Sequence, residues 1–280
     1  MDSATNAHAP IPTAEAARKS ALVDSVGFWW HTIDVGDGVV TPGIKTGAQL
    51  AAEFAALNLP TLNGLTVLDI GAWDGFFSFE ADRQGASRVV ALDWYVWALR
   101  LPEVEEYKAR CADQGIAQKP LTEIPELWSE ELPGKRGFDI AHQLLDSRID
   151  VVAEDFMTVD PESLGRFDIT LFLGVLYHQR HPLLALERVR EFTRSVAVIE
   201  SHAAVYPGLE HLAMCEFFEL NELANDPTNW WAPNLTALIK LCRAAGFGEV
   251  DVVVGPTREL LDLPPGAAPA PYRAIVHARP

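Results

Sequence analysis

The sequence has little of what a disulfide-stapled or membrane-spanning protein requires. Its three cysteines, Cys111, Cys215 and Cys242, lie far apart without a C-x-x-C pair, so we expect neither a disulfide framework nor a thiolate zinc site. No apolar run approaches the ~20 residues that cross a bilayer. Residues 1–13 lack the basic start and hydrophobic core of a signal peptide. We therefore expect a cytoplasmic protein with reduced thiols and no membrane partner.

Positive charge is also scarce. The chain has 22 Lys and Arg against 39 Asp and Glu, which gives a formal net charge of −17. A field of that sign repels phosphate backbones, which nucleic-acid-binding proteins neutralise with clustered Lys and Arg. Nucleic acid is therefore disfavoured as a partner, although the net charge does not exclude a small local basic groove. With 280 residues, 49% of them hydrophobic, the chain can bury a substantial core.

Short apolar runs alternate with helical patterns along most of the chain. The expected strands cover 66–70, 88–93, 151–155, 167–173, 195–200, 250–254 and 273–277. The expected helices cover 14–30, 49–57, 76–84, 139–145, 182–192 and 235–245. Solid apolar strands separated by helices indicate a parallel sheet covered on both faces, and the last two strands are typical of a hairpin-type addition. We predict an α/β, Rossmann-like doubly wound fold with a mostly parallel seven-stranded sheet.

The same patterns predict how the chain is divided. Residues 1–13 are expected to be a flexible tail, and residues 14–60 an N-terminal helical cap. Residues 61–280 would form the main domain, with a long insertion at 95–138 and an active-site segment at 201–233.

The strongest local motif joins the first strand to a helix through a turn bounded by Gly71 and Gly75, with Asp69 two positions before the turn. Such a turn offers backbone N–H groups and a bare glycine surface to a nucleotide-like ligand. The spacing differs from the G-x-G-x-x-G fingerprint, which disfavours a nicotinamide dehydrogenase. It suits a ligand with an amino-acid part at the turn and a ribose beyond it.

Acidic residues also follow the next two strands. Asp93 closes the second strand, where a carboxylate can accept ribose hydroxyls. Asp155 and Phe156 close the third, and they offer an acceptor for an exocyclic amine and an aromatic face for a purine. Each acid alone is a common turn residue, but together they mark one edge of the predicted sheet.

In these features the chain resembles the class I S-adenosylmethionine-dependent methyltransferases over about residues 64–200, with Trp73 in place of the family's usual middle glycine. The resemblance implies S-adenosylmethionine as cofactor. It assigns the methionine part to the turn, the ribose to Asp93, and the adenine to Asp155 and Phe156. The complete expected cofactor site is Asp69, Gly71, Ala72, Trp73, Asp74, Gly75, Asp93, Trp94, Asp155, Phe156, Leu173 and Gly174.

A second resemblance is narrower. The segment from Phe172 to Leu183, FLGVLYHQRHPL, is similar to the G-V-L-Y-H-x-x-x-P-L segment of the tRNA wobble-uridine (5-methoxy or carboxymethoxy) methyltransferase-like family. The segment from Trp230 to Phe247 is similar to that family's late aromatic-x-Pro stretch and helix. This likeness implies tRNA as an alternative substrate, but one scaffold carries many chemistries, so a small molecule stays our leading acceptor.

Two residues are candidates for catalysis. His178 follows the fourth strand, near the expected methyl position, and is a candidate base or acceptor-orienting group. Glu200 closes the fifth strand near His202 and is the second candidate. A hydrogen-bonded structural His178 and a loop-capping Glu200 are the alternatives.

The expected acceptor site consists of aromatic and polar residues outside the central strands. Its members are Trp29, Trp30, His31, Tyr177, Glu216, Trp230 and Trp231. Aromatic clusters more often pack a core, which is the alternative here. His202, His211, Glu216 and Glu219 lack HExxH-like spacing, so we expect no metal. A cofactor-binding protein without catalytic activity is a further alternative for the function. The sequence also leaves open whether the protein forms a homodimer.

Overall fold

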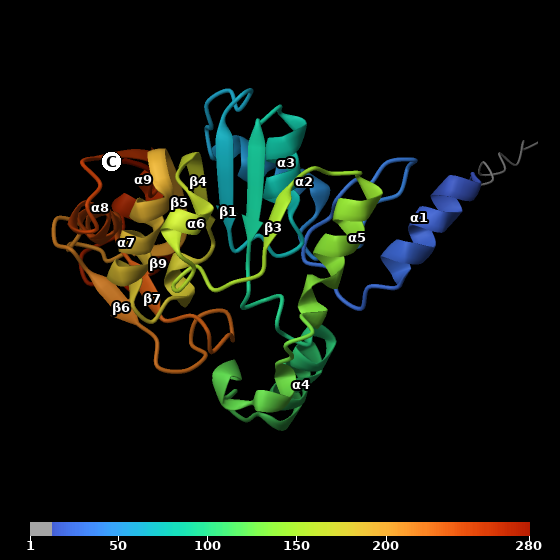
Figure 1. Ribbon diagram of the computed structural model, residues 1–280. Coiled ribbons are helices and arrows are strands. Elements are labelled where there is room, and N and C mark those ends of the chain that lie inside the picture. The colour runs from blue at the N-terminus through green and yellow to red at the C-terminus, as the bar shows by residue number, and fades with distance from the viewer. Residues whose placement is uncertain (1–12) are drawn as a thin grey trace, which may run out of the picture.

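The computed structural model describes residues 13–280, and a seven-stranded mixed sheet forms its centre (Figure 1). Of the predicted tail, all but Thr13 lies outside the described residues. The strand order is β3–β2–β1–β4–β5–β9–β8. These strands are β1 (Thr66–Ile70), β2 (Arg88–Leu92), β3 (Asp150–Val152), β4 (Phe167–Leu173), β5 (Thr193–Val205), β8 (Glu249–Val254) and β9 (Ala270–Arg279). The predicted Rossmann-like α/β fold with a mostly parallel seven-stranded sheet is confirmed.

Strands β1 to β5 of this sheet run parallel, and β9 runs antiparallel to both β5 and β8. The expected hairpin-type addition is therefore confirmed, with β9 inserted between β5 and β8. A two-stranded antiparallel sheet, β6 (Cys215–Phe217) with β7 (Trp231–Pro233), lies outside the main sheet.

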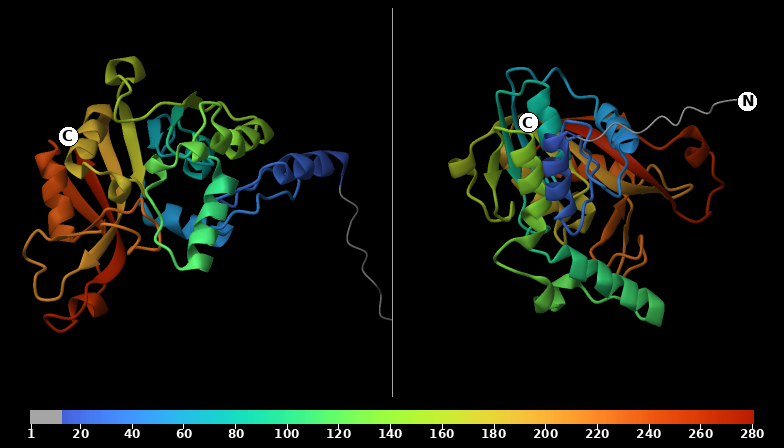
Figure 2. Two further views of the ribbon diagram at one scale, coloured as in Figure 1. Left: turned by 90° about the horizontal axis from the view of Figure 1, so that it is seen from below. Right: turned by 90° about the vertical axis from the view of Figure 1, so that its right-hand side faces the viewer.

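Helices cover both faces of the sheet because its strands are apolar on both sides. Along β1, Val67 points into one core and Leu68 and Ile70 into the other. The first core is closed by α1 (Ala14–Asp24), α2 (Gly47–Ala56), α3 (Phe76–Arg83) and α5 (Arg136–Leu144). The second core is closed by α6 (Pro161–Leu164), α7 (Pro182–Phe192) and α8 (Leu235–Ala244). Helix α1 lies at one end of the molecule and α8 toward the other (Figures 1 and 2).

Several predicted boundaries are wrong, and three of these differences affect the predicted cap or the site. Helix α1 ends at Asp24 rather than at residue 30, because the Trp29 indole N–H donates to the Val23 carbonyl at 3.2 Å and the chain then turns onto the sheet. Strand β3 ends at Val152, so Asp155 lies three residues beyond it. Strand β5 continues to residue 205, where β9 pairs with its second half.

The predicted long insertion at 95–138 contains a further helix. Helix α4 (Leu101–Gln114) has a proline in its first turn and ends at Gly115 in the left-handed conformation. Two contacts join this insertion to residues 218–230, the late segment between β6 and β7. The Gln118 amide donates to the Asn225 carbonyl at 2.8 Å, and Lys108 lies 3.8 Å from Asp226. Both regions lie on the lower side of the sheet in Figure 1.

The remaining short elements lie in connections. They are α9 (Arg258–Leu261) and the 3₁₀ turns Leu121–Glu123, Pro125–Leu127, Pro133–Lys135 and Leu176–His178. Across residues 13–280, no helix is both long enough and apolar enough to traverse a lipid bilayer.

Candidate functional site

The glycine turn after β1 is pressed against the loop after β4. Gly71 has φ +83°, and a Cβ on it would lie 2.6 Å from Cγ2 of Val175, so only glycine fits. Trp73 also has a positive φ of 49°, which a bulky residue rarely adopts. The Trp97 indole N–H donates to the Trp73 carbonyl at 2.8 Å and helps to hold this conformation. Packing against Val175 and the hydrogen bond from Trp97 thus hold the turn in this conformation.

Asp74 binds the N-terminal cap to this turn. One oxygen of its carboxylate accepts the backbone N–H of Trp30 at 2.6 Å and that of His31 at 2.9 Å. Burial raises the pKa of Asp74 to about 7 and lowers the pKa of His31 to about 3. The other Asp74 oxygen and the His31 Nδ1 are buried without a hydrogen-bond partner among the described residues.

Asp69 is directed to helix α3. Its carboxylate accepts the Ser78 hydroxyl at 2.6 Å, and the side chain is buried. Burial raises the pKa of Asp69 to about 6, and the charge of Asp93 raises it further. Asp69 therefore fixes the start of α3 under the turn.

Asp93 lies beside the turn, and each of its carboxylate oxygens accepts a hydrogen bond. It accepts the backbone N–H of Trp73 at 3.0 Å and that of Val96 at 3.2 Å. Burial raises the pKa of Asp93 to about 6, and the nearby charge of Asp155 raises it too. A carboxylate offers about four lone-pair positions, so two bonds leave room for further donors.

Asp155 and Phe156 differ in exposure. Asp155 is exposed, and its Oδ1 accepts the Met157 N–H at 3.0 Å. Phe156 is buried, with its ring edge-on to Phe172 at 5.4 Å, so it presents no free face in this conformation. Asp69 near the end of β1, Asp93 after β2 and Asp155 beyond β3 lie toward the same edge of the sheet, because the three strands are parallel neighbours. The charge of Asp93 raises the pKa of Asp69, and that of Asp155 raises the pKa of Asp93.

The other expected cofactor residues lie at the same edge. Leu173 ends β4, next to the strand that ends at Ile70, and Gly174 follows it with φ +71°. The exposed Trp94 follows Asp93, and its ring stacks on Trp128 at 5.6 Å.

His178 lies in the 3₁₀ turn after β4 and contacts the late segment. Its Nδ1 is 3.1 Å from the Thr228 carbonyl oxygen and 2.9 Å from the Thr228 hydroxyl. That hydroxyl also bonds to Asp226 Oδ1 at 2.6 Å. Burial lowers the pKa of His178, so the ring is neutral at neutral pH. Thr228 and Asp226 were not among the residues expected from the sequence, because 50 residues separate Thr228 from His178.

Glu200 forms an ion pair with Arg273 of β9, through both guanidinium nitrogens that face it. The guanidinium also lies 4.9 Å above the Tyr177 ring. The pairing with Glu200 raises the pKa of Arg273 against the effect of its burial, so the arginine stays charged and neutralises Glu200. Sequence reasoning placed Arg273 only in a strand; the antiparallel pairing of β9 with β5, which sets Arg273 opposite His202, brings it here.

The expected acceptor residues divide into three groups. Trp30 and His31 join the cap to the turn, whereas Trp29 is core. The Trp230 backbone N–H donates to the Tyr177 carbonyl at 2.8 Å, and the Trp231 indole N–H donates to the Gln179 carbonyl at 2.9 Å. Both tryptophans are therefore held against the turn that carries His178. The Glu216 N–H, in β6, donates to the Tyr206 hydroxyl at 2.8 Å.

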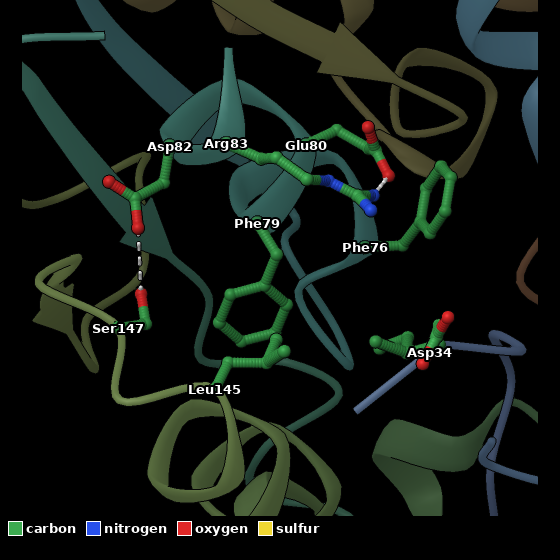
Figure 3. A pocket seen from close by; sticks show the side chains of 9 residues that line it. Asp34, Phe76, Phe79, Glu80, Asp82, Arg83, Leu145 and Ser147 are labelled. Carbon is green, nitrogen blue, oxygen red and sulfur yellow. Dashed lines mark hydrogen bonds and ion pairs between the residues drawn. The ribbon is translucent and has the colours of Figure 1, made fainter. Parts of the chain in front are cut away.

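A cavity of about 250 Å³ lies elsewhere, between the cap, α3 and the loop after α5. Figure 3 shows Leu145 below the Phe79 ring, and Phe76 and the cap residue Asp34 to their right. Asp82 and Ser147 close one end with a 3.3 Å hydrogen bond. None of the expected catalytic residues lines this cavity.

No protein-family model matches the chain. Curated relatives named tRNA U34 carboxymethyltransferase are similar to it. The protein from Desulfotalea psychrophila is 24% identical over 195 residues, covering 70% of this chain and 49% of the relative. The protein from Pseudomonas aeruginosa strain LESB58 is 28% identical over 199 residues, covering 69% and 48%. The chain thus spans about half the length of the curated relatives it matches, and its resemblance to the tRNA wobble-uridine family is confirmed.

Solved structures share the fold. The N-terminal domain of EvdMO1 with SAH bound matches with a TM-score of 0.59 at 16% identity, covering 94% of this chain and 96% of that one. The same domain crystallised in the presence of SAH and D-fucose matches with a TM-score of 0.56 at 17% identity, covering 95% and 97%.

Proposed function

We propose that the chain is an S-adenosylmethionine-dependent methyltransferase that acts on a small-molecule acceptor. The observation that carries the proposal is the hydrogen bond from the Trp73 N–H, in the Gly71–Gly75 turn, to Asp93, with Asp155 near enough that its charge raises the pKa of Asp93. The fold likeness to a domain solved with SAH supports it. In open α/β sheets, ligands bind outside the carboxyl ends of the strands.

The residues at this edge fit the proposed cofactor. Asp93 keeps acceptor capacity for ribose hydroxyls, and Asp155 is free to accept from an adenine amine. A Cβ on Gly174 would be in van der Waals contact with Arg273, Tyr177 and Glu200 at 3.7–3.8 Å, so these polar side chains lie directly beside the Gly174 backbone. The buried Trp73 indole N–H has no acceptor among the described residues and offers a donor at the turn. When bound, the cofactor supplies a methyl carbon on a cationic sulfur, and the chain's part is to orient the acceptor.

A small acceptor fits the charge of the chain better than tRNA does. The net charge is −17, and four of the acidic residues, Glu216, Glu219, Glu222 and Asp226, lie in β6 and in the segment between β6 and β7. A small molecule, D-fucose, was also present with the fold neighbour EvdMO1. The names of the curated relatives favour tRNA wobble uridine as the second candidate. We further propose a cytoplasmic location, in keeping with three free cysteines.

Calorimetric titration with S-adenosylhomocysteine tests the proposal. We expect binding by the wild type and a loss of about 1–3 kcal/mol in Asp93→Ala, the range for charge-assisted hydrogen bonds, or roughly 5- to 150-fold in Kd. Asp150→Ala is the matched control, because Asp150 begins β3 at the opposite edge of the sheet, in an exposed pair with Arg88. No binding by the wild type would overturn the proposal, and an equal loss in the control would remove Asp93 from the site.

Methyl transfer then distinguishes the acceptors. Wild-type protein is incubated with labelled S-adenosylmethionine and either bulk tRNA or a library of small hydroxylated and amino compounds. Label in a small molecule supports the proposal, and label in tRNA favours the second candidate. Binding without transfer to either class would favour a catalytically silent protein. Sedimentation of the same sample measures whether the chain forms the homodimer that its sequence leaves open.

A further inference from the structure

The loop that carries His178 is held on the glycine turn. Val175 packs against Gly71, where its Cγ2 occupies the space a Cβ would need. The Tyr177 and His178 rings lie 4.3 Å apart. Val175 lies against the turn of the proposed cofactor site, and His178 follows it three residues later in the same 3₁₀ turn region.

The hydrogen bonds around His178 determine which ring nitrogen carries the proton. The Thr228 carbonyl can only accept, so Nδ1, which lies 3.1 Å from it, has to be the donor. The Thr228 hydroxyl donates its own hydrogen to Asp226, which leaves only its lone pairs for Nδ1. Both partners select the Nδ1–H tautomer. Nε2 then holds a free lone pair, and it has no hydrogen-bond partner among residues 13–280 and is not sealed from solvent.

The charges around this ring come from α4, from β9 and from the loop between β6 and β7. Burial lowers the pKa of His178 most; Asp226 raises it, whereas Arg273 of β9 and Lys108 of α4 lower it. The Tyr177 ring lies 4.3 Å from the His178 ring, and the His202 ring lies 6.1 Å from that of Tyr177. Asp226 is thus the nearby anion that favours a positive charge on His178.

We infer that Thr228 and Asp226 are positioning residues, which hold His178 with Nε2 as the proton acceptor and stabilise the imidazolium that forms there. This inference rests on the proposed function. As the acceptor atom bonds to the methyl carbon, the electron pair of the broken carbon–sulfur bond stays on sulfur. The acceptor's proton passes to Nε2 and from there to water. The geometry parallels the way in which a carboxylate orients a catalytic histidine, with a threonine hydroxyl between them.

Nitrogen-detected NMR of the imidazoles tests this without any methyl transfer. In wild-type protein, His178 should titrate from the Nδ1–H tautomer. In Asp226→Asn, its pKa should fall, because the anion that favours the protonated ring is lost. The matched control is Glu219→Gln, which removes one charge from the same segment at an exposed position. An unchanged pKa in Asp226→Asn, or an Nε2–H tautomer in the wild type, would overturn the inference.

Thr228 provides a second test. Thr228→Val should lower the His178 pKa as Asp226→Asn does, and Thr228→Ser should restore it. Once an acceptor is known, the acid limb of the pH–rate profile should move to lower pH in Asp226→Asn, with unchanged affinity for S-adenosylhomocysteine. Failure of the wild type to bind that ligand would defeat the proposed function but leave the NMR result standing. If Asp226→Asn leaves the titration of His178 unchanged but abolishes binding of S-adenosylhomocysteine, the positioning role is wrong and the proposed function still stands.

Discussion

The indole of Trp73 in the glycine turn stacks on the indole of Trp30 in the cap, with ring centroids 4.8 Å apart and planes 6° from parallel. Phe28 stacks on the same Trp73 ring at 6.3 Å. The next residue of the turn, Asp74, accepts the backbone N–H of Trp30 at 2.6 Å. Ring stacking on Trp73 and the buried Asp74 side chain therefore both attach the cap to the glycine turn.

Trp30→Ala should loosen the cap. We expect the free energy of unfolding to fall by about 1–3 kcal/mol, from lost apolar burial and lost stacking. Cleavage by a protease within residues 26–45 should become faster. Trp30→Phe keeps a ring and is the control, with less than half of either effect. Equal cleavage rates in all three proteins would mean that other contacts hold the cap.

Asp74→Asn should change how stability depends on pH. Burial raises the pKa of Asp74 from 3.8 to about 7, so the folded state holds this proton more tightly than the unfolded chain does. The stability contributed by the neutral acid is complete below about pH 4 and is lost as the pH rises through about 7. The variant cannot ionise, so wild type should lose stability relative to it over this window, by about 1.4 kcal/mol for each pH unit that separates the folded and unfolded pKa values.

Urea unfolding at pH 5 and pH 8 measures this difference. His31, with its pKa lowered to about 3, is present in both proteins, so its own pH dependence cancels. A wild-type-to-variant difference that is the same at both pH values would contradict the buried, protonated state of Asp74.

Gly75→Ala should destabilise the chain more than Gly115→Ala. Both glycines have positive φ, at +88° and +62°, so alanine is strained at either position by about 1–2 kcal/mol. A Cβ on Gly75 would also lie 2.7 Å from ring carbons of Phe138 and Phe79, whereas Gly115 has open space. Crowding of this kind costs a further ~1–3 kcal/mol. Similar midpoints of thermal unfolding for the two variants would refute the close packing at the turn.

The sheet and its turn were predictable because their signals are local. Apolar runs such as 167–173 and the Asp69, Gly71 and Gly75 spacing each lie within a few residues of sequence. Helix α4 gave no comparable signal, because only Leu101, Val104 and Cys111 of its 14 residues are buried. A helix that buries so few side chains resembles a charged loop in composition.

Other features depend on contacts between distant segments. The pattern of apolar residues continues to Trp30, yet α1 ends at Asp24, where the Trp29 indole N–H bonds to the Val23 carbonyl, and Asp74 then binds the Trp30 N–H. The expectation that Asp155 closes β3 is wrong for a similar reason, since β3 pairs with β2 over only three residues. The partners of His178 likewise come from a segment whose fold no local pattern indicates. The roles of the site residues remain predictions.

The placement of β9 has a consequence for synthesis of the chain. One side of β5 pairs with β4, but the other side has to wait for β9, which begins about 65 residues after β5 ends at residue 205. At ribosomal speeds of about 5–20 residues per second, that side stays open for several seconds. The cap is affected as well, because His277 of β9 bonds to the Leu57 carbonyl at 2.8 Å. A nascent chain of this protein therefore exposes an unpaired apolar strand edge that a chaperone can shield until β9 emerges.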